Sequence, residues 1–122
     1  MNMTDDLDMI SFRIIADASD AKDLALDAFK EAMCANYAKS DELLAKSRST
    51  LEKARRAQTD VLFDEMNGKT NTVNVLLVHS QDHLTAAQTT LAMVENLMPL
   101  VMAQYELKEK VEKLEGRIDH EN

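Results

Sequence analysis

The most constraining feature of this sequence is an apolar stripe near its N-terminus that advances in steps of three and four residues. Its members are Leu7, Ile10, Ile14, Ala18, Ala21, Ala25, Ala28 and Ala32. Steps of this size place all of these side chains on one face of an α-helix. Because most of them are alanines, the face is narrow and a neighbouring helix can approach it closely. The stripe therefore predicts a helix that packs tightly against other helices along one side.

A second stripe of the same kind follows in the middle of the chain. Its members are Leu44, Ser47, Leu51, Ala54, Gln58 and Val61. The stripe ends before Asn67-Gly68, and glycine readily takes the left-handed conformation that closes a helix. Residues 69–72 then form a connection, after which a third helix runs to about Ile118, with Pro99 expected to kink it or remove one hydrogen bond. Short loops make consecutive helices antiparallel, so the sequence predicts an all-α, antiparallel three-helix bundle.

The third predicted helix carries two apolar seams. The first seam consists of Leu84, Ala87, Leu91, Val94, Met98, Val101 and Tyr105. The second seam consists of Met93, Leu97, Leu100, Gln104, Leu107, Val111, Leu114 and Ile118. At about 100° per residue, the first seam is centred roughly 90° from His79, and the second lies close to the direction of Asp82. One seam serves the bundle core and the other suggests a subunit interface. The alternative is one broad buried face in a four-helix arrangement.

Charge and hydropathy argue against several classes of partner. The formal net charge of the 122-residue chain is −8 and its isoelectric point is about 4.8. Sequence-independent binding to nucleic acid needs a basic surface, and an anionic membrane would repel this chain. The longest apolar stretch, residues 91–103, is interrupted by Glu95 and Pro99 and is too short to span a bilayer. We therefore expect no nucleic-acid partner and no direct membrane insertion.

The cysteine content and the N-terminus bear on the compartment. Cys34 is the only cysteine, so the chain cannot form an internal disulfide. It lies in an alanine-rich helical stretch, where we expect a small buried side chain rather than a reactive thiol. The N-terminus is acidic, unlike the basic start of a signal peptide. These features predict a cytoplasmic protein.

Residues 78–84, which read VHSQDHL, contain the side chains best suited to bind a metal ion or to take part in a reaction. His79, Asp82 and His83 lie at positions i, i+3 and i+4, so they share one side of the predicted helix. Two such histidines can bind one zinc ion, but a structural site needs four ligands and the chain has a single thiol. The metalloprotease pattern HExxH needs glutamate where Ser80 stands. A neutral imidazole can also accept a phosphoryl group. The residues alone leave surface histidines, a metal site and a phosphoryl acceptor open.

The wider sequence resembles a known family. LLVHSQDHLT (76–85) is similar to the Gln-Asp-His block of the lactose/cellobiose/chitobiose enzyme IIA proteins, which belong to the bacterial phosphoenolpyruvate-dependent sugar phosphotransferase system. Supporting similarities lie in IIADASDAK (14–22), NYAKSDELL (36–44), ARRAQT (54–59) and EMNG (65–68). The resemblance covers roughly residues 7 to 102. The chain departs from the family pattern at Ser19 for glycine, Lys22-Asp23 for Arg-Ser, Arg55 for histidine and Thr85 for methionine.

This resemblance implies a homotrimer whose helices pack around a threefold axis. It implies that His79 carries the phosphoryl group and that Asp82 of each chain surrounds a Mg²⁺-like ion on the axis, with no organic cofactor. Such a cation would offset the carboxylates, which otherwise favour a protonated histidine. Gln81 and His83 become candidate donors to the phosphoryl group. The implied partners are HPr, which supplies the phosphoryl group, and the IIB component, whose cysteine receives it during sugar uptake.

The predicted organisation is a helical domain over residues 1–105 and a charged helical extension over 106–122. The extension is either a coiled coil that continues the oligomer or a fraying tail. Two other functional hypotheses accompany the phosphocarrier. One is a non-enzymatic interaction module that kept the fold and lost phosphotransfer, which the altered segment 19–23 favours. The other is a histidine phosphotransfer domain of two-component signalling, in which a lysine and a glycine usually follow the reactive histidine.

Overall fold

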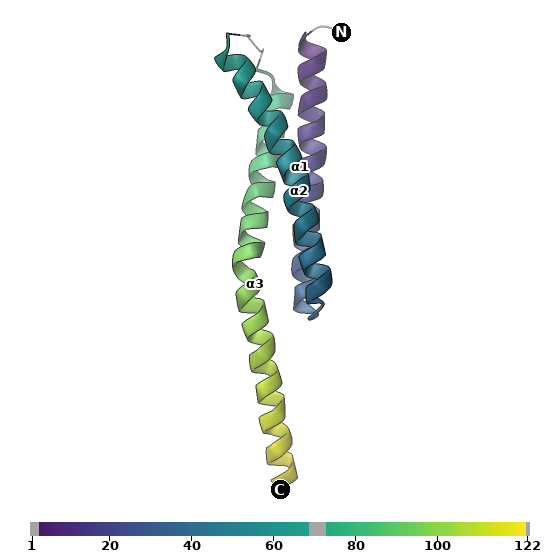
Figure 1. The fold of residues 1–122 in the computed structure, drawn as a ribbon, viewed down its shortest axis with the longest axis vertical. Helices are drawn as coiled ribbons and strands as arrows, with labels where there is room; N and C mark the ends of the chain where they lie inside the picture. Colours follow the sequence, from purple (N-terminus) through teal and green to yellow (C-terminus); the bar gives the residue numbers. More distant parts are fainter. Residues whose placement is uncertain (1–2, 69–72, 122) are drawn as a thin grey trace.

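The computed structural model describes residues 3–68 and 73–121, and this part of the chain consists of three helices without strands (Figure 1). The helices are α1 (Met3–Met33), α2 (Tyr37–Met66) and α3 (Val75–Glu121). Consecutive helices run antiparallel, which confirms the predicted three-helix bundle (Figure 1). The connection predicted at residues 69–72 lies outside the described residues. No described helix is both long enough and apolar enough to cross a membrane.

The helix ends follow from local chemistry. A tight turn joins α1 to α2, and in it Ala35 has a φ of 62°. After α2, the predicted terminator Gly68 has a φ of 85°, the left-handed conformation that glycine adopts without strain. Before α3, the side-chain oxygen of Asn74 accepts the backbone N–H of Leu77 at 2.9 Å. Such a cap satisfies one of the backbone donors that a helix start leaves unpaired.

The core lies along α1, which packs extensively against both other helices, whereas α2 and α3 touch each other little. The predicted stripe on α1 is buried except for Ile10, which is half-buried, and its alanines are at most 1% exposed. On α2, Ser40 and Ser47 are fully buried and donate to the carbonyls of Ala28 and Ala21 at 2.8 and 2.6 Å. Small side chains on both helices bring the backbones close enough for these contacts.

The two seams of α3 have different environments. The first seam is buried from Leu84 to Met98 and packs against the alanine stripe. The apolar members of the second seam are 38–64% exposed, although they lie on the same helix. The alternative of one broad buried face in a four-helix arrangement is therefore wrong for the described chain. Pro99 lies inside α3, which continues through it as a single helix.

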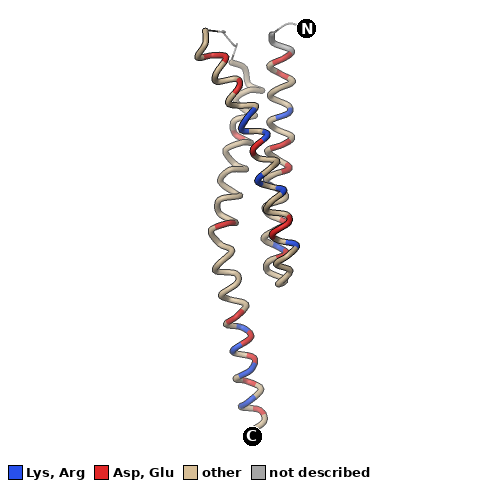
Figure 2. Tube along the Cα trace, viewed as in Figure 1, with Lys and Arg blue, Asp and Glu red and all other residues tan. Residues whose placement is uncertain are grey.

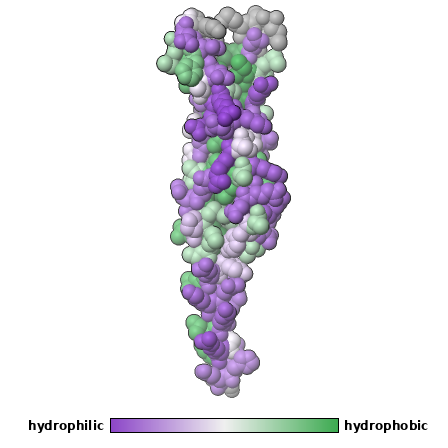
Figure 3. Space-filling model, viewed as in Figure 1, coloured by the Kyte–Doolittle hydropathy of each residue, from purple (hydrophilic) through white to green (hydrophobic). Residues whose placement is uncertain are grey.

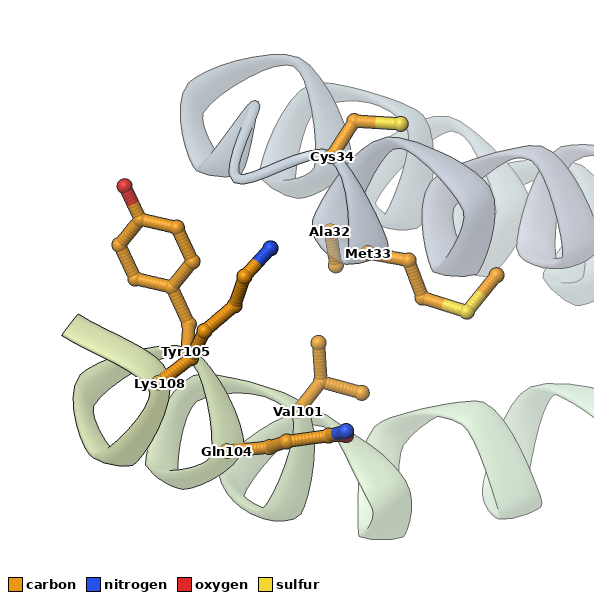
Figure 4. Close-up of a pocket in the computed structure, with 7 residues that line it drawn as sticks. All are labelled: Ala32, Met33, Cys34, Val101, Gln104, Tyr105 and Lys108. Carbon is orange, nitrogen blue, oxygen red and sulfur yellow. The ribbon is translucent and has the colours of Figure 1, made fainter. Parts of the chain in front are cut away.

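The end of α1 corrects one expectation. Cys34 is exposed rather than buried, because α1 ends at Met33 and the buried stripe stops at Ala32. Figure 4 shows a hollow between this end of α1 and α3, in which the thiol points away from α3 while Val101 points toward α1. Beyond it the Tyr105 ring packs edge-on against a tyrosine at the start of α2, with ring centroids 6.1 Å apart. The neighbouring Glu109 carboxylate raises the pKa of Tyr105.

Candidate functional site

The centre of the candidate site is a pair of histidines one turn apart on α3. The Nε2 atoms of His79 and His83 are 3.1 Å apart, and the rings meet edge-to-face. His79 is exposed, whereas His83 is half-buried. At this distance one Nε2 donates its proton and the other accepts it, so the two rings adopt complementary tautomers. The pair thus presents an accessible imidazole with a second imidazole as its hydrogen-bond partner.

A serine from α1 completes this arrangement. Ser19 Oγ lies 3.1 Å from His83 Nδ1, so both ring nitrogens of His83 are engaged. When the hydroxyl donates to Nδ1, His83 carries its proton on Nε2 and donates to His79. The sequence marks Ser19 only as a departure from glycine. Its contact with His83 arises from the packing of α1 on α3, and no local sequence pattern predicts it.

Gln81 turns toward α2 instead of toward the histidines. The Gln58 amide donates to the Gln81 side-chain oxygen, and Gln81 Nε2 lies 3.4 Å from the hydroxyl of buried Ser80. At about 100° per residue, Gln81 points roughly 160° away from His79 around the helix. Gln58 itself is half-buried, and its side chain is hydrogen-bonded within the bundle. The structure therefore joins Gln81 to α2 and does not bring it next to His79.

Asp82 is exposed and makes no hydrogen bond or ion pair with another described residue. It lies on the face of the second seam, among exposed and mostly apolar neighbours. These neighbours are Val75, Val78, Ala86, Thr89 and Met93. The described residues contain no cluster of three histidine, cysteine or acidic side chains that could hold a metal ion. A metal site built on Asp82 would need carboxylates from other copies of the chain, and such a set of oxygen ligands suits Mg²⁺.

Comparison with known proteins assigns this chain and its fold to a family. The family model of the PTS system lactose/cellobiose-specific IIA subunit matches residues 9–102. The lactose-specific EIIA component of Staphylococcus aureus is 31% identical over 101 residues, which cover 83% of this chain and 94% of that protein. The lactose-specific EIIA component of Streptococcus mutans is 32% identical over 92 residues, which cover 75% of this chain and 88% of that protein.

Solved structures agree with the sequence matches. The cellobiose-specific enzyme IIA of Bacillus anthracis superimposes with a TM-score of 0.80 at 26% identity, covering 87% of this chain and 94% of that one. PtcA from S. mutans superimposes with a TM-score of 0.79 at 28% identity, covering 84% of this chain and 99% of that one. The family match spans most of the chain and includes the histidine pair. The chain therefore belongs to the lactose/cellobiose-specific IIA subunits and is a component of a sugar phosphotransferase system.

Proposed function

We propose that this protein is a phosphocarrier that accepts a phosphoryl group from phospho-HPr on His79 and passes it to a cysteine of a IIB component during sugar uptake. One observation carries the proposal. In a member of the IIA family, His79 is an exposed imidazole whose Nε2 is held 3.1 Å from the Nε2 of His83. An exposed acceptor suits transfer between proteins, because the phosphorylated side chain of the donor must reach it. A cytoplasmic location belongs to the same proposal.

The proposed transfer is a balanced exchange of one phosphorus–nitrogen bond for another. A bond forms from His79 Nε2 to phosphorus as the bond to the histidine of HPr breaks. When His83 is the donor of the pair, His79 carries its proton on Nδ1 and has a lone pair on Nε2, which becomes free to attack once the hydrogen bond from His83 breaks. Positioning and electrostatic stabilisation supply most of the catalysis in phosphoryl transfer. The freed Nε2–H of His83 can then donate to a phosphoryl oxygen.

Gln81 and Ser19 have different places in this scheme. A role for Gln81 next to the phosphoryl group stays a prediction, since its amide would first have to leave Gln58. Ser19 instead acts as a positioning residue, because a hydroxyl that donates to His83 Nδ1 favours the tautomer in which His83 is the donor.

Replacing Ser19 with alanine is expected to slow phosphoryl loading about fivefold, corresponding to one lost hydrogen bond of about 1 kcal/mol. Stopped-time loading by phospho-HPr measures the rate, and ¹⁵N chemical shifts of the imidazoles report the tautomers. Ser19→Thr keeps a hydroxyl and should restore both. Ser49→Ala is the matched control, because Ser49 is exposed on α2. An unchanged rate with unchanged tautomers in Ser19→Ala would remove Ser19 from the mechanism.

We also propose that three chains associate through the face that carries Asp82 and that the three carboxylates hold a divalent cation such as Mg²⁺. Two features support this arrangement: the exposed apolar neighbours of Asp82 and the absence of any partner for its carboxylate within the described chain. Burying such a face would bring like charges together, and a cation would offset their repulsion. When bound, the ion supplies positive charge at the interface.

The cation proposal predicts that EDTA weakens the wild-type assembly, whereas the assembly of Asp82→Leu is the same in EDTA and in Mg²⁺. Leucine removes the repelling charges and adds apolar surface, so no cation is needed. Sedimentation velocity over a range of protein concentrations measures the effect. Asp41→Leu, an exposed position on α2, is the control and should respond to EDTA like wild type. A wild-type trimer that is indifferent to EDTA would contradict the cation site.

The phosphocarrier proposal is tested on the full-length wild-type chain. The protein is incubated with phosphoenolpyruvate, enzyme I and HPr, and acid-labile phosphate is counted per chain. About one phosphate per chain, which leaves the protein when a IIB component is added, is the expected result. The absence of label while HPr is charged would favour the second candidate, an interaction module without phosphotransfer. The altered segment 19–23, in which Lys22-Asp23 stands for the family's Arg-Ser, is the observation that favours this candidate.

A further inference from the structure

The last part of α3 is a helix with no intrachain partner. It projects past the ends of α1 and α2 (Figure 1), and each residue from 106 to 121 except Gly116 is classed as exposed. The family match stops at residue 102, so this segment lies beyond the matched part of the chain. A helical segment of this length that contains a glycine is only marginally stable alone in water. The projecting helix would therefore be stabilised by packing against a partner.

The second seam continues along this projection with coiled-coil spacing. From Met93 to Ile118 its members alternate in steps of four and three, the heptad repeat of positions a and d. The a positions are Leu97, Gln104, Val111 and Ile118, and the d positions are Met93, Leu100, Leu107 and Leu114. The four apolar members on the projection are 43–61% exposed. Figure 3 shows apolar patches on this otherwise hydrophilic end of the molecule. The seam thus runs without a break from the bundle onto the projection.

The charges next to the seam select an orientation. Figure 2 shows that Lys, Arg, Asp and Glu are concentrated in the projecting part of α3, whereas the preceding part is nearly free of charge. Lys110 occupies a g position and Glu115 the following e position, five residues later. In a parallel pair these two positions lie opposite each other on different helices and attract. An antiparallel pair would instead bring Lys110 toward Arg117, the next g residue, and this repulsion would offset the attraction between the e residues Lys108 and Glu115.

We propose that residues 106–121 of separate copies, which the association proposed above brings together, form a parallel coiled coil beyond the bundle. A symmetric parallel arrangement places each apolar a or d residue against its own counterpart and each Lys110 against a Glu115, so the surface is complementary to itself. Gln104, a polar residue at an a position, fixes the register of the helices. The number of helices in the coiled coil equals the number of copies that associate through their bundles. The inference does not depend on phosphotransfer.

Hydrogen exchange on the full-length chain tests the coiled coil. In wild type, the backbone amides of residues 108–118 are expected to exchange slowly. Leu114→Glu puts a charge at a d position and should speed their exchange roughly tenfold or more. Gly116→Glu is the matched control, because it adds the same charge at the outward f position, where a new Cβ meets no atom within 4 Å. This control should leave the amides as protected as in wild type, or more so.

Two results would overturn the inference. The first is wild-type exchange in residues 108–118 as fast as in an unfolded peptide. The second concerns orientation: with Leu114→Cys in a Cys34→Ser background, parallel helices should form disulfide-linked chains under mild oxidation. Protected amides without this crosslink would exclude the parallel arrangement. Phosphate counting on Leu114→Glu separates the coiled-coil proposal from the phosphocarrier proposal. If the amides of residues 108–118 lose their protection while His79 still accepts phosphate, the coiled coil is not needed for phosphotransfer. A wild-type protein with protected amides but without phosphate would leave the coiled coil standing alone.

Discussion

Alanine in place of His79 is expected to abolish phosphoryl loading, from about one acid-labile phosphate per chain to none. The variant has no nitrogen at the exposed position, and His83 is half-buried, with its ring nitrogens occupied by Ser19 and, in wild type, by His79. Such a loss is larger than that of any supporting residue, because the bond to phosphorus cannot form. Incubation with phosphoenolpyruvate, enzyme I and HPr, followed by phosphate counting and intact-mass spectrometry, measures it.

Two further histidine variants sharpen this experiment. His120→Ala removes an exposed histidine near the end of α3 and should load like wild type. His83→Gln keeps a side chain that can donate, and should load more slowly but to the same final extent. Full loading of His79→Ala would place the phosphoryl group elsewhere and contradict the assignment. Circular dichroism of each variant guards against a trivial loss of fold.

Leucine in place of Ala21 is expected to destabilise the bundle by about 1–3 kcal/mol, because the larger side chain has no space. Ala21 is 0% exposed, and its carbonyl accepts a 2.6 Å hydrogen bond from Ser47 on the neighbouring helix. The backbones of α1 and α2 are therefore too close for three extra carbons. The added side chain must push the helices apart or take a strained rotamer.

Urea denaturation followed by circular dichroism, at one fixed protein concentration, measures this effect as a lower midpoint with a similar slope. Ala45→Leu makes the same chemical change at an exposed position of α2 and should change stability by less than about 0.5 kcal/mol. Equal midpoints for Ala21→Leu and wild type would show that the stripe can accommodate larger side chains. The close packing of α1 on α2 would then need another explanation.

Periodicity predicted most of the fold because helix packing leaves a regular trace in the sequence. The alanine stripe from Ala18 to Ala32 is buried as predicted, and α2 ends at Met66, just before Asn67-Gly68, where Gly68 takes a positive φ. The prediction that Cys34 is buried was wrong, because it rested on the composition of the surrounding residues, whereas burial depends on the residue at which the helix ends. One residue past the stripe is enough to expose the thiol.

The candidate site was predictable only where it is local. The spacing of His79 and His83 already placed them one turn apart, and the structure shows their Nε2 atoms in contact. The contact between Ser19 and His83 joins residues 64 positions apart, so it depends on the rotation of α1 against α3. Gln81 was placed near the phosphoryl group by resemblance, whereas its hydrogen bonds place it against α2. Pairwise contacts between helices are the part that periodicity does not encode.

The central position of α1 has a consequence for how the chain is made. Both other helices pack on α1 and hardly on each other, so α1 is the surface that the rest of the fold needs first. Of the three helices it is synthesised first, and α2 can fold back onto it across a tight turn as soon as α2 is made. A chain in which α1 came last would leave α2 and α3 with wet apolar faces throughout translation, open to aggregation. The order of the helices thus allows assembly to keep pace with synthesis.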